Sequence, residues 1–178
     1  MPILQSDILF KFSVAAAAGN TTVGTPAGSL GDQISTTQIT GATLHNLFDV
    51  VTGDENAASD VEYRCFFVHN AHATLTLENA VIWLQSETAG GAVAAISVDT
   101  TGITVLGSGS AQAKTVADEN TAPSAQSFSS PTSKGTGLAL GSIPAGSVIG
   151  IWVRRSAANT TALDNDGVVI RVEGDTAA

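Results

Sequence analysis

Short apolar runs recur along this chain, and most of them alternate with polar positions. The runs are rich in Val, Ile, Phe and Thr, and Gly, Pro, Asn or Asp residues separate them. Such runs are typical of β-strands joined by turns, because alternate side chains of a strand point to opposite faces of a sheet. The pattern predicts strands at residues 8–14, 33–40, 61–69, 73–77, 80–86, 93–98, 102–106, 147–154 and 168–172.

This succession of short strands predicts an all-β fold, a β-sandwich of which the jelly roll is one form. The one helical candidate is residues 43–51, whose apolar residues recur at helical spacing before Gly53. We interpret this segment as one or two turns of helix on a connection. Long loops of small residues complete the expected fold.

Two of the predicted strands are apolar on both faces. In residues 61–68, one face carries Tyr63, Cys65 and Phe67, and the other carries Arg64, Phe66 and Val68. Residues 147–154 alternate in the same way and include Trp152. Because a strand that is apolar on both faces is buried on both, we expect these strands inside a sandwich or between subunits. Trp83 lies in a similar apolar strand, so we place both tryptophans in the core.

The chain divides into four segments. Residues 1–14 are an N-terminal strand or docking arm, residues 15–32 a flexible tether, residues 33–174 a single β-sandwich domain, and residues 175–178 a frayed tail. A tethered strand can add to the exposed sheet edge of another subunit as readily as to its own domain. We therefore predict partner contacts for the apolar residues of this arm, which are Ile3, Leu4, Ile8 and Phe10.

One further segment is too long for a simple connection. Residues 107–137 consist mostly of small and polar residues. Loops of this length inside compact domains are usually functional or disordered. We leave open whether this segment is ordered alone or only after assembly, and residues 111–116 and Phe128 are candidates for short edge strands.

Charge narrows the range of partners. The net charge is −9, and the seven Lys and Arg residues are scattered rather than gathered into a stripe. This distribution argues against binding to nucleic acid or to an anionic membrane, since both require clustered basic residues. The chain has no run of about 18 apolar residues that would span a membrane, and its N-terminus lacks the features of a secretory signal. A single cysteine makes no intramolecular disulfide.

Two of the three histidines lie close enough in the sequence to suggest a metal site. His69 and His72 flank an apparent turn at Asn70 and Ala71, and no further ligand stands nearby in the sequence. We interpret them as the end of a hairpin whose loop meets a neighbouring subunit, and add both to the predicted partner contacts. Residues 163–167, LDNDG, resemble the start of a calcium loop but run into an apolar strand. A turn is the favoured interpretation, with a cation shared between subunits as the alternative.

The search for catalytic groups finds no set that belongs together. Cys65 lies in an apolar strand, where a thiol is normally inert. The chain contains no Gly-x-Ser-x-Gly, no His-Glu-x-x-His and no phosphate-binding glycine loop. The carboxylate pairs at residues 54–55 and 118–119 lie in polar stretches typical of solvated turns. We therefore predict no enzyme, no cofactor and no metal site.

A resemblance to a known family adds to this interpretation. The segments that carry it, in order, are SLGDQIS from Ser29, LFDVVTGDENAASDVEYRCFFVHN from Leu47, AVIWL from Ala80, AQAKTVADENTAP from Ala111 and IPAGSVIGIWVRR from Ile143. This order resembles a family of small structural proteins encoded in the virion gene clusters of tailed phages. The likeness spans most of the chain, from about Ser29 to Arg155.

The resemblance implies a capsid decoration, or cement, protein with a β-sandwich or jelly-roll domain. Such a protein would be made in the host cytoplasm, bind the major capsid protein on the capsid surface of the virion, and act as a homo-oligomer, with a trimer favoured. No capsid-binding residue of the family maps onto this chain. Two alternatives stay open: a tail, baseplate or fibre component of the same virion, and a carbohydrate-binding or adhesin module that would need an exposed aromatic platform.

Overall fold

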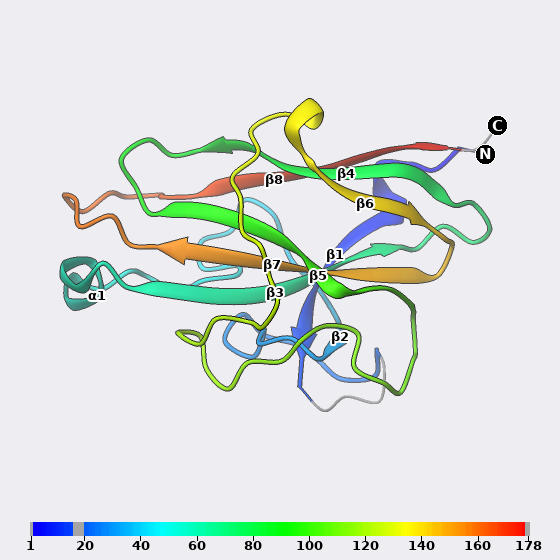
Figure 1. Ribbon diagram of the computed structural model, residues 1–178, viewed down its shortest axis with the longest axis horizontal. Coiled ribbons are helices and arrows are strands. Elements are labelled where there is room, and N and C mark those ends of the chain that lie inside the picture. Colours follow the sequence, from blue (N-terminus) through cyan, green and yellow to red (C-terminus); the bar gives the residue numbers. More distant parts are fainter. Residues whose placement is uncertain (1, 16–19, 177–178) are drawn as a thin grey trace.

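Two antiparallel sheets pack face to face in the computed structural model, which describes residues 2–15 and 20–176 (Figure 1). The larger sheet has the strand order β2-β1-β3-β7-β5, and the smaller has the order β6-β4-β8. The strands are β1 (Ile8–Val14), β2 (Gln33–Gln38), β3 (Val61–Asn70), β4 (Leu77–Glu87), β5 (Val93–Val105), β6 (Leu138–Ile143), β7 (Ser147–Ser156) and β8 (Val168–Thr176). The predicted all-β, sandwich-like fold is confirmed.

Helices contribute little to this architecture. The described residues contain α1 (Gly53–Ala58) and the single 3-10 turns η1 (Gln5–Asp7) and η2 (Lys134–Thr136). No helix within residues 2–15 or 20–176 is long and apolar enough to cross a membrane.

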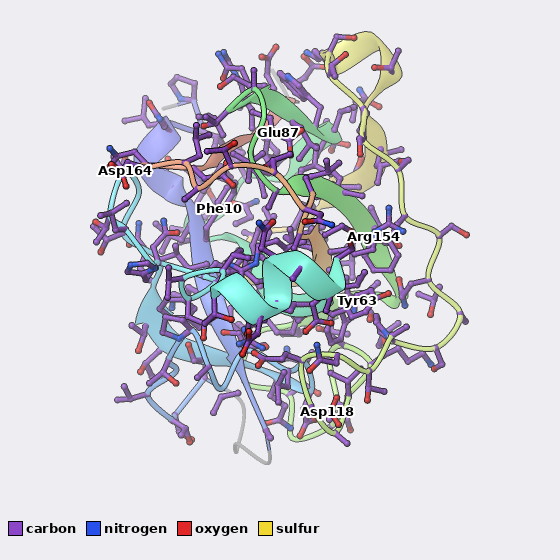
Figure 2. The ribbon with its side chains drawn as sticks, turned by 90° about the vertical axis from the view of Figure 1, so that its left-hand side faces the viewer. Phe10, Tyr63, Glu87, Asp118, Arg154 and Asp164 are labelled. Atoms are coloured by element: carbon purple, nitrogen blue, oxygen red, sulfur yellow. The ribbon has the colours of Figure 1, made fainter. Side chains whose placement is uncertain are left out.

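The larger sheet is buried on both faces, by two different kinds of cover. The smaller sheet covers one face, and the core between the sheets includes Phe66, Val68 and Ile151. Irregular chain covers the other face, where Cys65, Phe67 and Trp152 form a second apolar cluster. Figure 2 views the molecule from the α1 end, and the larger sheet lies between the smaller sheet and the loop that carries Asp118.

β3 and β7 form the centre of the larger sheet. They pair in antiparallel register from Val61 opposite Ser156 to His69 opposite Val148, and Cys65 lies opposite Trp152. Both strands contribute side chains to both apolar clusters. The prediction that these two strands are buried on both faces is therefore confirmed.

The irregular cover of the second cluster is held by two buried polar side chains. Asp99 of β5 is 2% exposed, and its Oδ2 accepts hydrogen bonds from Trp152 Nε1 at 2.7 Å and from the backbone N–H of Lys114 at 2.9 Å. Gln112 is fully buried, its Oε1 accepts from the N–H of Ile34 at 3.1 Å, and its Nε2 donates to the carbonyl of Val105 at 3.0 Å. These bonds supply partners for polar groups that burial would otherwise leave unpaired.

Part of the expected tether belongs to this cover. Residues 16–19 lie outside the described residues, but Gly31 lies directly under Trp152 with a φ of +94°. A Cβ at Gly31 would lie 1.8 Å from the carbonyl oxygen of Lys114. Only glycine fits such a position, so the chain around Gly31 packs against the second cluster, in a segment that we predicted to be a flexible tether.

The predicted helix at residues 43–51 is wrong. His45 has a φ of +57° in the middle of this segment, which is therefore a series of turns. Helix α1 begins at Gly53, beyond the end of this segment. The Thr52 side chain caps it by accepting from the N–H of Glu55, while the Glu55 side chain accepts from the N–H of Thr52. The periodic apolar residues serve tertiary packing instead, since Leu47 and Phe48 pack against the core between the sheets.

Several strand boundaries also differ from the prediction. The predicted strands 93–98 and 102–106 are one strand, β5, in which the pairing register shifts near Gly102 at φ +80°. Residues 73–76 are not a strand, and β4 starts at Leu77. β6 was not predicted, because its run LALGSI is short and contains a glycine at positive φ. β8 extends to Thr176, so residues 175 and 176 are paired rather than frayed, and residues 177–178 lie outside the described residues.

The N-terminal strand lies within its own sheet. β1 is placed between β2 and β3, and it pairs with β3 from Ile8 opposite Asn70 to Phe12 opposite Phe66. The ring of Phe10 lies 5.1 Å from that of Phe66. The structure therefore contains an integral strand where the sequence also allowed an arm docked on another subunit.

Replacing Asp99 tests the role of this carboxylate as an anchor. Both carboxylate oxygens of Asp99 accept, because Oδ2 bonds Trp152 and Lys114 and Oδ1 bonds the N–H of Thr101. Asp99→Asn keeps one acceptor oxygen and no charge, so the donors on one side meet an amide donor and the bonds that persist are weaker. We expect a loss of about 2 kcal/mol in the free energy of unfolding, measured by urea denaturation. Amide hydrogen exchange at Lys114 should also accelerate.

Asp118→Asn is the matched control, because Asp118 is an exposed carboxylate within the irregular segment that Asp99 holds in place. It should change neither the unfolding midpoint nor exchange at Lys114. Equal effects of the two substitutions would contradict the anchoring role of Asp99.

Candidate functional site

The most polar part of the interior lies beside the first half of β3. β1 pairs with β3 only from Phe66 onward, so on that side β3 has no neighbouring strand along residues 61–65, although β7 pairs with its other side. Two loops fill this place through their carbonyl groups: Ser29 accepts from the N–H of Cys65, and Glu119 accepts from the N–H of Tyr63, both at 2.7 Å. We call this region, between residues 25–29, 45–49 and 119 and the first half of β3, the β3 notch.

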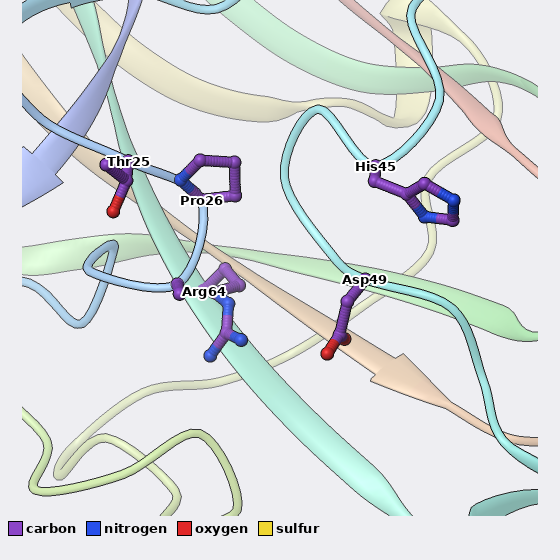
Figure 3. A pocket seen from close by; sticks show the side chains of 6 residues that line it. Thr25, Pro26, His45, Asp49 and Arg64 are labelled. Atoms are coloured by element: carbon purple, nitrogen blue, oxygen red, sulfur yellow. The ribbon is translucent and has the colours of Figure 1, made fainter.

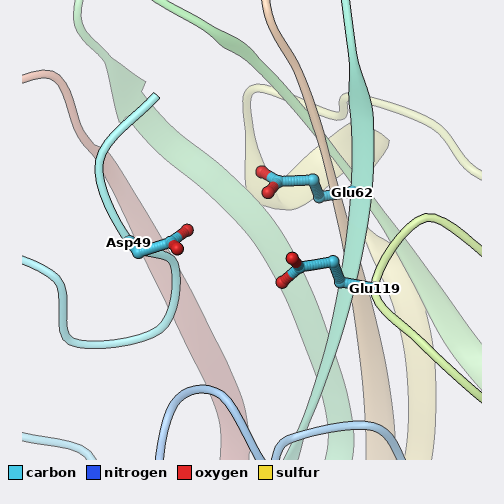
Figure 4. Close-up of side chains that lie close together, drawn as sticks. All are labelled: Asp49, Glu62 and Glu119. Atoms are coloured by element: carbon cyan, nitrogen blue, oxygen red, sulfur yellow. The ribbon is translucent and has the colours of Figure 1, made fainter. Parts of the chain in front are cut away.

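Five charged side chains converge in the notch. Glu62 and Arg64 come from β3, Arg155 from β7, Asp49 from the loop before α1 and Glu119 from the long irregular segment. Each of the three carboxylates offers an oxygen within 4.8 Å of the others, and Figure 4 shows these groups directed toward a common centre. Such a set of oxygen atoms could in principle hold a hard cation.

Two arginines occupy this centre instead. Arg155 Nε donates to Glu62 Oε2 at 2.6 Å, and Arg155 also bonds the side chain and carbonyl of Asp49. Arg64 pairs with Glu119. The guanidinium groups already supply positive charge and donors to all three carboxylates, so a metal ion would have to displace them.

Phe48 covers this ion cluster. Its ring centroid lies 4.8 Å from the guanidinium carbon of Arg155 and 5.8 Å from that of Arg64. Both arginines are shielded from solvent, with side chains 13% and 4% exposed. Burial raises the pKa of Glu62, although the adjacent Arg155 opposes this shift. The cluster thus fastens the loop before α1 to the central strands.

A small pocket of about 230 Å³ opens beside the cluster (Figure 3). Its lining residues are Thr25, Pro26, Ala27, His45, Asp49 and Arg64. Arg64 Nε has no hydrogen-bond partner among the described residues, but this atom is inaccessible to solvent. The pocket therefore offers mainly small apolar groups and the edge of a charge cluster that is already paired.

The predicted partner-binding residues are divided between surface and interior. Leu4 is 54% exposed, whereas Ile3, Ile8 and Phe10 are half-buried and pack against the core between the sheets. His69 is only 6% exposed, and His72 is half-buried. The structure does not gather the six into one exposed surface.

The two histidines do not end a hairpin as predicted. β3 and β4 belong to different sheets, so the residues between them cross from one sheet to the other. Asn70 is the last residue of β3, and its side-chain amide donates to the carbonyls of Leu75 and Ile143. His72 Nδ1 accepts from the N–H of Leu75 at 3.0 Å. These bonds make the segment a fixed corner of the sandwich.

His69 is buried with little electrostatic support. Its Nδ1 has no hydrogen-bond partner among the described residues. Burial, with a contribution from the charge of Lys11, lowers the pKa of His69 to about 4. The imidazole is therefore neutral at neutral pH and is poorly suited to accept a proton in the folded state.

The remaining aromatic and thiol groups are internal. Trp152 is fully buried and Trp83 is 6% exposed, so the predicted burial of both tryptophans is confirmed. Neither side chain provides the exposed platform that the carbohydrate-binding alternative requires. Cys65 is also fully buried, and burial raises the pKa of its thiol, as expected of an inert cysteine.

Sequence reasoning missed the ion cluster. Glu119 was assigned to a solvated turn, and Asp49 was hidden in the expected helix. A signal was nevertheless present, because Glu62 and Arg64 interrupt an otherwise apolar, two-sided strand and would be costly to bury unpaired. The opposite charges could have come from any loop, so the sequence alone did not name the partners.

Comparison with known proteins gives no relative. No protein-family model, no curated protein and no solved structure matches this chain.

Removing Arg155 tests the ion cluster. Arg155→Ala leaves Glu62 and Asp49 without their shared countercharge in a largely buried place. We expect the free energy of unfolding to fall by about 3 kcal/mol, measured by chemical denaturation at pH 7. Lys134→Ala removes an exposed ion pair with Glu173 and should leave the unfolding midpoint nearly unchanged. Similar losses in both variants would argue against a special role for the cluster.

His69 predicts a defined pH dependence of stability. Its pKa is lowered on folding from 6.5 to about 4, so the unfolded chain binds more protons between these values and stability falls as the pH drops through this window. The full effect is on the order of 3 kcal/mol. Replacing the imidazole by a neutral ring in His69→Phe should remove this component of the pH profile.

The comparison is made between denaturation curves at pH 7, 5.5 and 4.5. The control is His45→Asn, which removes an exposed imidazole at a position of positive φ that asparagine tolerates, and it should keep the wild-type profile. An unchanged profile for His69→Phe would show that other groups cause the acid sensitivity.

Proposed function

We propose that this protein is a non-enzymatic structural subunit of a tailed-phage virion, and specifically a capsid decoration protein that binds the outside of the major capsid lattice. The observation that carries this proposal is the ordered series of segments that resembles the phage structural family. In the fold these segments provide β3, most of β7, the centre of β4 and the irregular cover of Trp152. The likeness thus concerns the interior framework of the protein.

The placement of charged groups supports a structural role. In the β3 notch, the carboxylates and arginines pair with one another and fasten loops to the central strands. The polar atoms of Asp99 and Gln112 are likewise engaged in hydrogen bonds that hold the irregular chain against the larger sheet. Side chains used in this way favour a rigid body that presents loops to a partner over a site that handles a substrate.

A rigid subunit suits the proposed task of cementing a lattice. A decoration protein stabilises a capsid by adding contact area across the joints between capsid subunits, and a specific interface needs roughly 1,000 Å² or more in total. If several copies are linked, each weak contact is reinforced because its neighbours hold it at high effective concentration. Small interfaces per copy are then sufficient.

Add-back to particles lacking this protein tests the proposal. Capsids produced without it are mixed with the purified chain, and binding is measured by co-sedimentation and by electron microscopy. We expect density at every symmetry-equivalent position of the shell and a higher temperature of capsid disruption. Density confined to the tail would favour the tail-component alternative, and a shell without added density would refute the decoration role.

Asp99→Asn and Asp118→Asn refine this experiment. Each removes one carboxylate, but only that of Asp99, in β5, anchors the irregular segment, whereas Asp118 is an exposed residue within that segment. If the ordered loop layer contributes to the binding surface, Asp99→Asn should weaken co-sedimentation and Asp118→Asn should not.

A further inference from the structure

The edges of the larger sheet are closed by the chain itself. On the β2 side, Asn20 donates to the carbonyl of Ile34 at 3.1 Å, and Thr36 donates to that of Thr22 at 2.9 Å. On the other side, residue 129 exchanges two backbone hydrogen bonds with residue 96 of β5, at 2.8 and 3.0 Å. Closure of this kind protects edge strands from pairing with other chains.

The smaller sheet is different, because its β8 edge is open. Among the described residues, no backbone group outside β4 hydrogen-bonds to the backbone of β8. The other edge strand, β6, is short, has two irregularities in its pairing with β4 and carries Gly141 at a φ of +79°. β8 is longer, and at both irregularities in the pairing of β4 with β8 the extra residue belongs to β4, so β8 itself has no bulge. Within residues 2–15 and 20–176, β8 is thus a regular sheet edge without a second backbone partner.

The hydrogen bond just before β8 shows which of its residues direct their backbone groups to the open edge. The carbonyl of Gly167 accepts from the N–H of Thr88 at 3.0 Å, so the polar groups of Gly167 face β4. Backbone groups of successive residues in an antiparallel strand point alternately to the two sides. The even-numbered residues from Val168 to Gly174 therefore direct their N–H and C=O groups to the open edge.

Charged side chains on β8 limit how this edge can pair. Arg171 lies opposite Trp83 of β4, with its guanidinium carbon 5.7 Å from the indole ring, and Glu173 lies opposite Val81. Both point to the outer face of the smaller sheet, and their side chains are 51% and 42% exposed. Within one chain, Glu173 Oε1 accepts from Lys134 Nζ at 2.7 Å, whereas Arg171 Nη2 lies 3.6 Å from Glu173 Oε2, so the pair of Arg171 with Glu173 is loose.

We propose that β8 pairs with β8 of a second copy of this chain, antiparallel and about a two-fold axis at Val172. In this register Arg171 of each copy lies opposite Glu173 of the other, at a pair position where side chains approach closely. Val172, whose backbone groups face the open edge, forms the central hydrogen-bonded pair. The two smaller sheets join into one continuous sheet.

Neighbouring registers are unfavourable. Side chains directly opposite each other must share a face, so the axis can move only by whole residues. An axis at residue 171 places Arg171 opposite itself, and an axis at residue 173 places Glu173 opposite itself. Like charges directly opposite destabilise a strand pair, so charge complementarity selects Val172 as the centre.

This pairing does not depend on the proposed function and goes beyond it. The two-fold contact differs from the trimer that the phage resemblance favours. It makes the same surface patch serve both copies, as in most soluble dimers.

Charge exchange provides the test. The purified protein is studied by analytical ultracentrifugation over a concentration series, and we expect a reversible dimer. Arg171→Glu and Glu173→Arg each place like charges opposite each other twice, so each should raise the dissociation constant at least about tenfold. The double variant Arg171→Glu/Glu173→Arg restores opposite charges and should restore the dimer.

Two further measurements separate pairing from folding. Lys114→Glu makes the same change of charge as Arg171→Glu at a position outside β8, and it should leave the dimer intact. Circular dichroism establishes that every variant is folded. Amide exchange at Ile170 and Val172 should slow as the protein concentration rises, since these N–H groups become bonded in the dimer.

A wild-type protein that stays monomeric at high concentration would overturn the proposal. So would a dimer that survives both single substitutions, or a double variant that remains dissociated. Capsid add-back with a monomeric variant is scored separately, so the loss of the dimer and the loss of capsid binding are distinguishable.

Discussion

The larger sheet is apolar on both faces, and most of the remaining structure follows from this constraint. One face is covered by a second sheet, whose own hydrogen bonds leave few polar groups to satisfy. The other is covered by irregular chain, which brings unpaired N–H and C=O groups into an apolar region. Asp99, Gln112 and the carbonyl of Ser29 accept or donate the bonds that make this cover possible. The hydrogen bonds of a few buried polar groups thus determine whether the long irregular segments are ordered.

The same principle explains the β3 notch. Where the pairing of β1 with β3 stops, β3 would expose backbone groups and charged side chains to a gap in the sheet. Two loop carbonyls accept hydrogen bonds from the strand there. The two arginines pair with carboxylates that come from β3, from the loop before α1 and from the long irregular segment. The ion cluster is therefore best understood as the completion of an interrupted sheet.

Sequence patterns were most informative where one physical effect dominated. The two-sided apolar alternation of Val61–Asn70 and Ser147–Ser156 correctly predicted the central strands, because only burial on both faces accounts for it. The helix prediction at residues 43–51 failed because apolar spacing there serves contacts of Leu47 and Phe48 with the core, while the capping box at Thr52 sets the helix start. β6 escaped notice because its short run contains a glycine and owes its conformation to pairing with β4.

The candidate site was less accessible to such reasoning than the fold. An ion cluster depends on which loops meet, and its members come from residues 49, 62, 64, 119 and 155. Sequence periodicity indicates which residues share a face of one strand or helix. It does not indicate which loops lie next to each other in the fold. The charged residues inside β3 indicated only that partners had to exist.

The position of β7 has a consequence for how the chain reaches its folded state. β7 is the shared neighbour of β3 and β5, yet it is synthesised after both of them and after the long irregular segment. Until it emerges, the two earlier strands lack the partner that joins them, and their apolar faces stay uncovered. Pairings between segments so distant along the chain are typical of slow folding. The nascent protein therefore passes through a stage in which uncovered apolar strands make aggregation compete with folding.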